Sequence, residues 1–148
     1  MEVFSSGENV NEYEIKLVDS HKDLTREQLE YLLFALQEIV TTCGGDLSLW
    51  KSMRFAFARE VNVTTCGVLA YDPKYDADGM LWIQIAYVDE ANRGEGLFGK
   101  MLAAIRAVHS SGKIGIATNT DNETALKAFR RAGFVESVRY LYLESERG

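Results

Sequence analysis

Hydrophobic positions in the first third of the chain recur with the period of an α-helix. Apolar residues at three- and four-residue steps share one predicted helix face: Leu29, Leu32, Leu33, Leu36 and Val40. Thr25 and Gln28 have the spacing of a capping box and predict where this helix begins. Gly44-Gly45 predicts its end, and residues 46–53 predict a shorter second helix. Residues 14–18 form a predicted strand before both helices.

Strand-like patterns follow in the middle of the chain. Residues 54–61 and 65–71 alternate or run apolar on either side of a turn near Asn62, which predicts a β-hairpin. An Asp-rich loop over 72–79 contains the only proline and leads to residues 80–88. This last segment is apolar almost throughout, so it predicts a central strand buried on both faces.

The remaining third predicts two more helices, each followed by strands. The first helix runs to about residue 109, with an inner face of Leu97, Met101, Ile105 and Val108. After a predicted strand over 113–117, Thr120 and Glu123 suggest a second capping box, and Gly133 would end that helix. Its buried face would hold Ala125, Ala128, Phe129 and Ala132. With strands over 134–136 and 138–143, the order is β-α-α-β-β-β-α-β-α-β-β, an α/β fold.

Length and charge add limits to this picture. At 148 residues the chain predicts one domain over residues 1–148. The net charge of −6 argues against nonspecific nucleic-acid binding. The charge is uneven, because residues 1–92 carry 16 acidic and 7 basic side chains and residues 93–148 carry 6 and 9. The basic part suits an anionic cofactor, whereas the acidic part suits a cation.

Several classes of protein are disfavoured. The first ten residues have neither a basic start nor an apolar run, and the apolar stretch 31–40 is interrupted by Gln37 and Glu38. We therefore expect a cytoplasmic protein without a membrane partner. Cys43 and Cys66 are expected to be free thiols. Two histidines offer little for a metal site or a cysteine nucleophile, so no metal is expected.

The segment Arg93-Gly94-Glu95-Gly96-Leu97-Phe98-Gly99 carries the main chemical signal. A glycine turn that opens a helix points several backbone N–H groups and the helix dipole at one place, which suits a pyrophosphate. One alternative is a turn that only joins a strand to a helix. Another is a dinucleotide fold, because the glycines spell G-x-G-x-x-G. That fold expects an acidic residue about 20 positions later, where residues 114–119 contain no carboxylate.

Two spaced motifs resemble the GNAT N-acyltransferase superfamily. Val88 followed by Arg93-x-x-Gly96 is similar to its signature Q/R-x-x-G-x-G/A. Asn122-x-x-Ala125-x-x-x-Phe129-x-x-x-Gly133-Phe134 is similar, at identical spacing, to its next motif, N-x-x-A-x-x-x-Y-x-x-x-G-F. The resemblance covers residues 80–143 well, and the first half only by the order of elements. It implies a GNAT-like mixed, mostly antiparallel central sheet flanked by helices.

The resemblance also implies acetyl-CoA as a cosubstrate and assigns its contacts. The pantetheine arm would bond to the backbone of Ala86 and Val88, and Asn122 would contact the same arm. The pyrophosphate would be held by the backbone amides of Arg93, Gly94, Glu95, Gly96, Leu97, Phe98 and Gly99. The Phe129 ring would lie beside the sulfur. Candidates for the adenosine phosphate are Lys100, Lys127 and Arg130.

The sequence departs from the family pattern at two positions. Phe98 stands where the signature usually has Gly or Ala, although its backbone amide is still present. Phe129 stands where many members have a tyrosine that protonates the departing thiolate, so that role does not carry over. The catalytic groups therefore stay open. Candidates for the acid are Tyr87, Thr118, Tyr140, Tyr142 and water; for the base Glu60, Asp89 and Glu90; and for an acceptor pocket Tyr71, Tyr75 and Trp82.

We expect an N-acetyltransferase that passes the acetyl group of acetyl-CoA directly to a primary amine. The acceptor could be a polyamine, an amino sugar, a peptide N-terminus or a protein lysine, and the charge asymmetry favours one that is cationic in solution. The alternative, suggested by Phe129, is a catalytically weak or inactive CoA-binding sensor or inhibitor with the same fold. A monomer and a homodimer are both compatible with the sequence.

Overall fold

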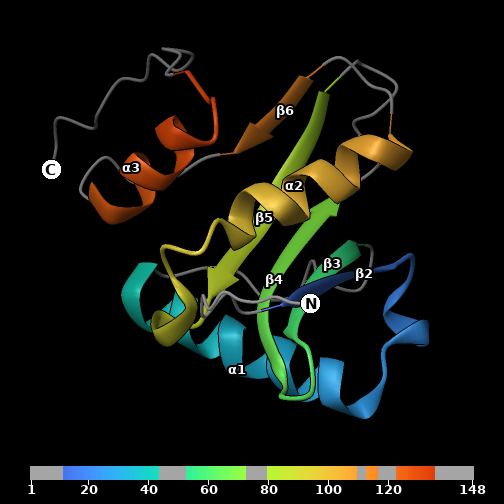
Figure 1. The fold of residues 1–148 in the computed structure, drawn as a ribbon. Helices are drawn as coiled ribbons and strands as arrows, with labels where there is room; N and C mark the ends of the chain where they lie inside the picture. The colour runs from blue at the N-terminus through green and yellow to red at the C-terminus, as the bar shows by residue number, and fades with distance from the viewer. Residues whose placement is uncertain (1–11, 44–52, 73–79, 110–112, 117–122, 136–148) are drawn as a thin grey trace, which may run out of the picture.

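The computed structural model describes residues 12–43, 53–72, 80–109, 113–116 and 123–135. Within them, the strands form one sheet in the order β2-β3-β4-β5-β6 (Figure 1). These strands are β2 Tyr13–Val18, β3 Arg54–Glu60, β4 Thr65–Asp72, β5 Met80–Val88 and β6 Lys113–Ile116. All neighbours are antiparallel except β5 and β6, which are parallel. The predicted mixed, mostly antiparallel sheet is confirmed.

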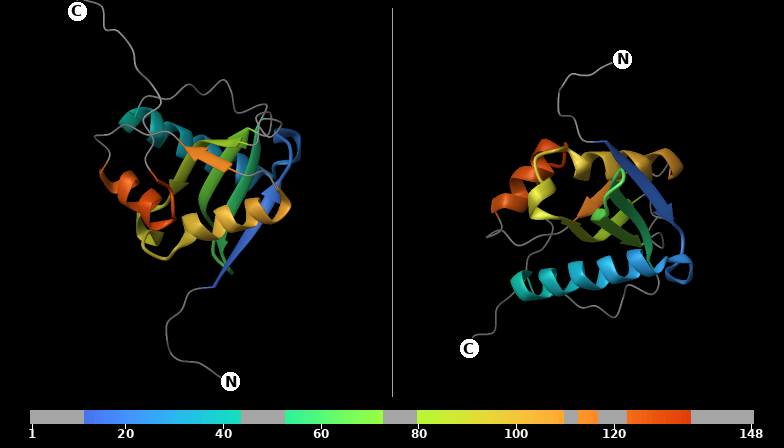
Figure 2. Two further views of the ribbon diagram at one scale, coloured as in Figure 1. Left: turned by 90° about the horizontal axis from the view of Figure 1, so that it is seen from above. Right: turned by 60° about the horizontal axis from the view of Figure 1, so that its bottom comes forward.

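Helices cover both faces of this sheet. α1 Arg26–Cys43 lies on one face, and α2 Leu97–Val108 lies on the opposite face (Figure 2). α3 Glu123–Arg131 lies near the end of β6 (Figure 1). Single 3-10 turns, η1 His21–Asp23 and η4 Glu90–Asn92, precede α1 and α2. None of the described helices is long and apolar enough to cross a bilayer.

Some predicted elements fall on residues outside the described ranges. They include the glycine pair after α1, all but the last residue of the helix expected over 46–53, and the strand over 138–143. Thr120, which belongs to the second predicted capping box, also lies outside. The predicted hairpin is confirmed, and its turn contains Asn62 at a φ of 67°.

The first helix begins as its sequence predicts. The backbone N–H of Thr25 donates to Gln28 Oε1 at 2.9 Å, and the N–H of Gln28 donates to Thr25 Oγ1 at 3.1 Å. This reciprocal pair is a capping box that satisfies two amides at the helix start. Leu32 and Leu36 are buried against the sheet as expected. The placement of Leu33 on the same face was wrong, because 49% of this residue is exposed.

The rotation of successive residues explains this error. Leu33 follows Leu32 by one residue, about 100° around the helix, which turns it to the edge of the apolar stripe. Ala35 takes a place in the core instead, packed with Phe55 and Val68. The expected burial of Val108 was also wrong, because it is 60% exposed. Val108 lies on the same helix face as Met101, but it is the last residue of α2.

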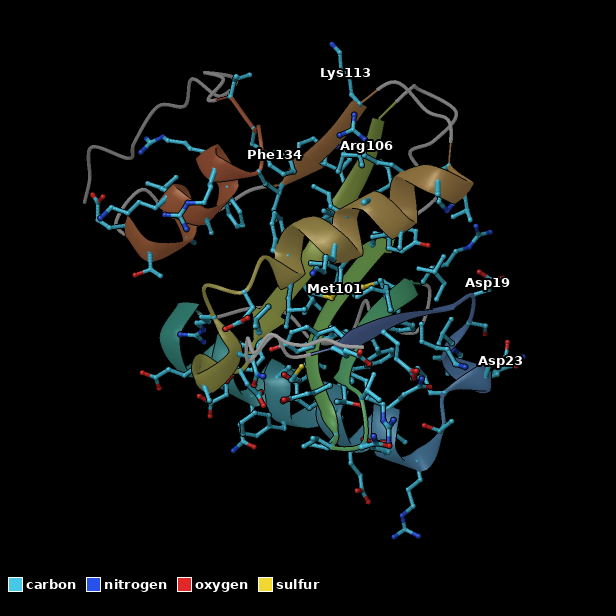
Figure 3. All side chains as sticks on the ribbon, in the orientation of Figure 1. Asp19, Asp23, Met101, Arg106, Lys113 and Phe134 are labelled. Carbon is cyan, nitrogen blue, oxygen red and sulfur yellow. The ribbon has the colours of Figure 1, made fainter. Side chains whose placement is uncertain are left out.

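The second core cluster lies between α2 and the other face of the sheet. Leu97, Met101 and Ile105 are buried there, as predicted, and Leu102 joins them. Met101 points from α2 toward the sheet (Figure 3). Its close approach depends on Gly67 of β4, since a Cβ at that position would stand 3.3 Å from Met101 Cε. The backbone of a central strand is thereby brought close to the helix that follows the glycine turn.

A β-bulge changes the pattern of β5. Ala70 of β4 pairs with Ile85, but the next residue, Tyr71, pairs with Ile83, which leaves Gln84 as an extra residue. Ile83 and Ile85 consequently belong to different core clusters, although a period of two would place them on one face. The prediction that this strand is buried on both faces was wrong at Gln84, which is exposed. The central strand β4 is instead buried from Thr65 to Tyr71.

Glu27 joins the start of α1 to the β3–β4 hairpin, and this contact makes stability depend on pH. Its Oε2 accepts from the Thr65 N–H at 3.0 Å and from Thr64 Oγ1 at 2.8 Å. The backbone hydrogen bond from Thr65, followed by that of Thr64, lowers the pKa of Glu27 below its ordinary value of 4.5. The folded state therefore binds this proton less readily than the unfolded state.

We expect the stability advantage of the native chain over Glu27→Gln to be present at neutral pH. It should disappear as the pH falls below about 4.5 through the lower pKa of the folded state. Urea unfolding of both proteins at a series of pH values measures the difference. A difference that stays constant down to acid pH would show that the carboxylate charge is not involved.

Candidate functional site

A cleft of about 850 Å³ opens where β5 ends and α2 begins. It is lined by Glu38 of α1, by most of residues 86–99 and by one side of α3. Pairing of β5 with the described part of β6 extends only from Met80 to Ile83. The last residues of β5, which have no partner in the described part of β6, line the cleft. Ala86, Tyr87 and Val88 are all among the lining residues.

The glycine turn contributes Gly94, Gly96 and Gly99 to the lining of the cleft. Gly94 and Gly96 have φ values of 87° and 79°, a left-handed conformation that favours glycine over any other residue. Gly96 is the N-cap of α2 and supplies no side-chain oxygen, so the first amides of the helix have no side-chain cap. Unpaired amides at the positive end of a helix dipole attract anions.

Arg93 folds back onto the end of β5. Its Nε donates to the Val88 carbonyl at 2.8 Å, and its guanidinium carbon lies 5.6 Å from the centre of the Tyr87 ring. The side chain thereby links the turn to the strand.

α3 contributes two positive charges to the lining of the cleft, those of Lys127 and Arg131. Of the predicted phosphate candidates, Lys100 lies over the Tyr13 ring at 6.0 Å and does not line the cleft, nor does Arg130.

Three phenylalanines join α2 to α3. The Phe98 ring centre lies 5.3 Å from that of Phe129 and 6.1 Å from that of Phe134, which is labelled in Figure 3. Gly133, at a φ of 103°, ends α3, and the Phe134 N–H donates to the Phe129 carbonyl at 3.0 Å. The predicted helix end is confirmed. The predicted apolar face of α3 is only half-buried, since no residue of α3 is fully buried.

A hydrogen bond connects α1 to the segment after β5. The Tyr31 hydroxyl donates to Asp89 Oδ1 at 2.6 Å, and the Asp89 N–H donates to the Cys66 carbonyl at 2.8 Å. Burial and then the bond to Asp89 raise the pKa of Tyr31, so it stays a donor. Burial also raises the pKa of the Cys66 thiol to about 11. For Tyr87, burial and then the charge of Glu38 raise the pKa of the phenol.

The cleft collects most of the residues predicted from the glycine motif. Those that line it are Ala86, Tyr87, Val88, Arg93, Gly94, Gly96, Leu97, Phe98, Gly99 and Phe129. Glu95 is exposed and does not line it. Glu60 does not line it either, and accepts from Asn92 Nδ2 at 3.3 Å at the end of β3. The candidates outside the described residues are Tyr75, Thr118, Asn122, Tyr140 and Tyr142.

Two aromatic candidates for an acceptor pocket have packing roles. Tyr71 is 1% exposed and lies edge-on to His109, with ring centres 5.4 Å apart. Trp82 lies against Gly115, where a Cβ would stand 2.9 Å from the indole ring. Neither lines the cleft. Sequence reasoning missed Glu38, whose only signal was a carboxylate within an otherwise apolar stretch of α1.

Comparisons with known proteins fit this geometry. No protein-family model matches the sequence. Acetyltransferase Atu2258 of Agrobacterium fabrum is 30% identical over 87 residues, which are 58% of this chain and 61% of that protein. Aminoglycoside N-acetyltransferase AAC(6')-Iy, solved with CoA, has a TM-score of 0.67 at 14% identity, covering 91% of this chain and 95% of that chain.

A GNAT family acetyltransferase, SP0256 from Streptococcus pneumoniae, has a TM-score of 0.63 at 14% identity, covering 90% of this chain and 98% of that chain. This chain has the GNAT fold. The resemblance inferred from the two motifs is confirmed at the level of the fold. In this GNAT fold the cleft adjoins both helices that carry the motifs, α2 and α3.

The Tyr31–Asp89 bond generates a prediction for this GNAT fold. Tyr31→Phe removes the donor and leaves a half-buried carboxylate, which should lower the free energy of unfolding by roughly 1–3 kcal/mol. Asp89→Asn in the same background should add little, because the two residues act as a pair. Urea unfolding of the single and double variants measures this coupling. Fully additive losses would contradict a direct interaction.

Proposed function

We propose that the protein is an N-acetyltransferase that binds acetyl-CoA in this cleft and transfers its acetyl group directly to a primary amine. The observation that carries the proposal is the uncapped glycine turn at the start of α2, which lines the cleft together with Lys127 and Arg131. A pyrophosphate needs such a set of amides and positive charges. The name of the Agrobacterium relative and the CoA complex of AAC(6')-Iy support the same activity.

The end of β5 would take the pantetheine arm. Its edge beyond Ile83 is not paired with the described part of β6, so backbone groups near Ala86 and Val88 are available to an extended ligand. The Val88 carbonyl already accepts from Arg93 and keeps one lone pair for such a contact. The amides of residues 93–99 would hold the pyrophosphate, and the Phe129 ring, which lines the cleft, would lie beside the sulfur. Asn122 would contact the arm as the second motif implies.

The reaction needs a group that protonates the leaving sulfur. The neutral amine attacks the acetyl carbon, the C–S bond breaks, the nitrogen loses a proton and the sulfur gains one. Phe129 has no hydroxyl, whereas Tyr87 is a hydroxyl residue that lines the described cleft. Its raised pKa keeps the phenol protonated at neutral pH. We assign the acid to Tyr87 and leave the deprotonation of the amine to water or to Glu90, which also lines the cleft.

The cofactor site can be tested by placing a charge in the turn. Gly96→Asp should weaken acetyl-CoA binding by more than about tenfold, because a carboxylate would stand beside the pyrophosphate. Calorimetry on the folded variant measures the affinity. Gly96→Ala gives the cost of backbone strain without the charge, and Gly133→Asp adds strain and charge at a left-handed glycine that does not line the cleft. Unchanged affinity in Gly96→Asp would remove the proposed cofactor site.

The acid can be tested by removing its hydroxyl. Tyr87→Phe should lower kcat by about a hundredfold while acetyl-CoA affinity stays the same. Phe129→Tyr in the Tyr87→Phe background should restore part of the activity by supplying a hydroxyl at the usual family position. Full activity in Tyr87→Phe would exclude this assignment. Tight acetyl-CoA binding without transfer to any amine would instead support the sensor or inhibitor alternative that Phe129 suggests.

A further inference from the structure

An exposed aromatic ring and a carboxylate share one face of α1, and the carboxylate lines the cleft. Phe34 and Glu38 stand four residues apart, so their side chains are neighbours on the helix surface. Phe34 is 47% exposed, which is unusual for a phenylalanine that touches other rings. Glu38 is exposed and lines the cleft.

Phe34 belongs to an aromatic group that links α1 to β5. Its ring centre lies 5.8 Å from that of Tyr87, nearly perpendicular to it, and 6.0 Å from that of Tyr31. The ring centres of Tyr31 and Tyr87 are 6.3 Å apart. The faces of aromatic rings attract organic ammonium groups, and a nearby carboxylate strengthens this attraction. Arg93 already lies over the Tyr87 ring, whereas Phe34 is partly exposed to a ligand.

The described residues that line the cleft carry charges of both signs. The acidic residues among the described lining residues are Glu38 of α1 and Glu90 of η4, and the basic ones are Arg93, Lys127 and Arg131. Asp19 and Asp23 are acidic residues that lie at the far side of the molecule from α3 (Figure 3) and do not line the cleft. Glu38 is thus the carboxylate that α1 contributes to the described lining of the cleft.

An acceptor that Glu38 holds through an ammonium group needs a second nitrogen that reacts. The reacting amine must be neutral to attack, so it cannot be the ammonium group that a carboxylate holds during the reaction. We infer that Phe34 and Glu38 form a subsite for a second, cationic nitrogen, and that the acceptor is a diamine or polyamine. This inference rests on the proposed acetyl transfer in the same cleft.

The experiment compares 1,4-diaminobutane with 1-aminobutane, two amines that differ by one ammonium group. In Glu38→Gln, kcat/KM for the diamine should fall by about tenfold, while kcat/KM for the monoamine changes by less than about twofold. Glu30→Gln is the matched control, because Glu30 is an exposed carboxylate of the same helix that pairs with Arg26. Phe34→Ala should act like Glu38→Gln, whereas Leu33→Ala, similarly exposed, should not.

Binding of 1,4-diaminobutane in the presence of CoA, measured by calorimetry, separates the subsite from the activity. Binding that weakens in Glu38→Gln, without acetyl transfer to either amine, would support the subsite and overturn the proposed function. Transfer with equal losses for both amines, or a preference for 1-aminobutane or for the N-terminus of a neutral peptide, would overturn the subsite alone. Failure of the native chain to bind the diamine would overturn it as well.

Discussion

The organisation of the cleft depends on the partial pairing of β5. Every backbone N–H and C=O group needs a partner, and β5 receives partners on both sides only up to Ile83 within the described residues. The glycine turn then leaves the first amides of α2 without a side-chain cap. A strand edge and a helix start with available polar groups therefore adjoin one another. The apolar core on either side of the sheet keeps both in place.

The two sides of the cleft are connected through the segment that follows β5. Asp89 bonds to Tyr31 of α1 and to the Cys66 carbonyl of β4, and Arg93 bonds back to Val88. The segment thus holds α1, the glycine turn and the last residue of β5 in one hydrogen-bonded unit. A ligand on the α1 side and a ligand on the glycine turn would contact parts of the same unit. The positions of both ligands would therefore depend on the hydrogen bonds of Asp89 and Arg93.

The sequence predicted the parts of the fold that follow from local periodicity and spacing. The Thr25 capping box, the hairpin turn at Asn62 and the end of α3 at Gly133 depend on neighbouring residues, and each is confirmed. The bulge at Gln84 depends on how β4 and β5 pair, which no local pattern records. Glu38 was missed as a lining residue for the same reason, since it reaches the cleft only because α1 packs across β5. The glycine motif identified the cleft because the groups proposed to bind the ligand there are backbone amides, whose positions depend on the local glycine pattern.

The contact between Phe98, Phe129 and Phe134 has an evolutionary consequence. Each ring lies beside the other two; Phe98 belongs to α2, Phe129 to α3, and Phe134 follows the end of α3 by three residues. A substitution at one position alters the fit of the others, so their effects on stability will not be independent. Related sequences with a small residue at position 98 would have room for a different side chain at position 129. The two unusual residues of the motifs are therefore expected to covary among related sequences.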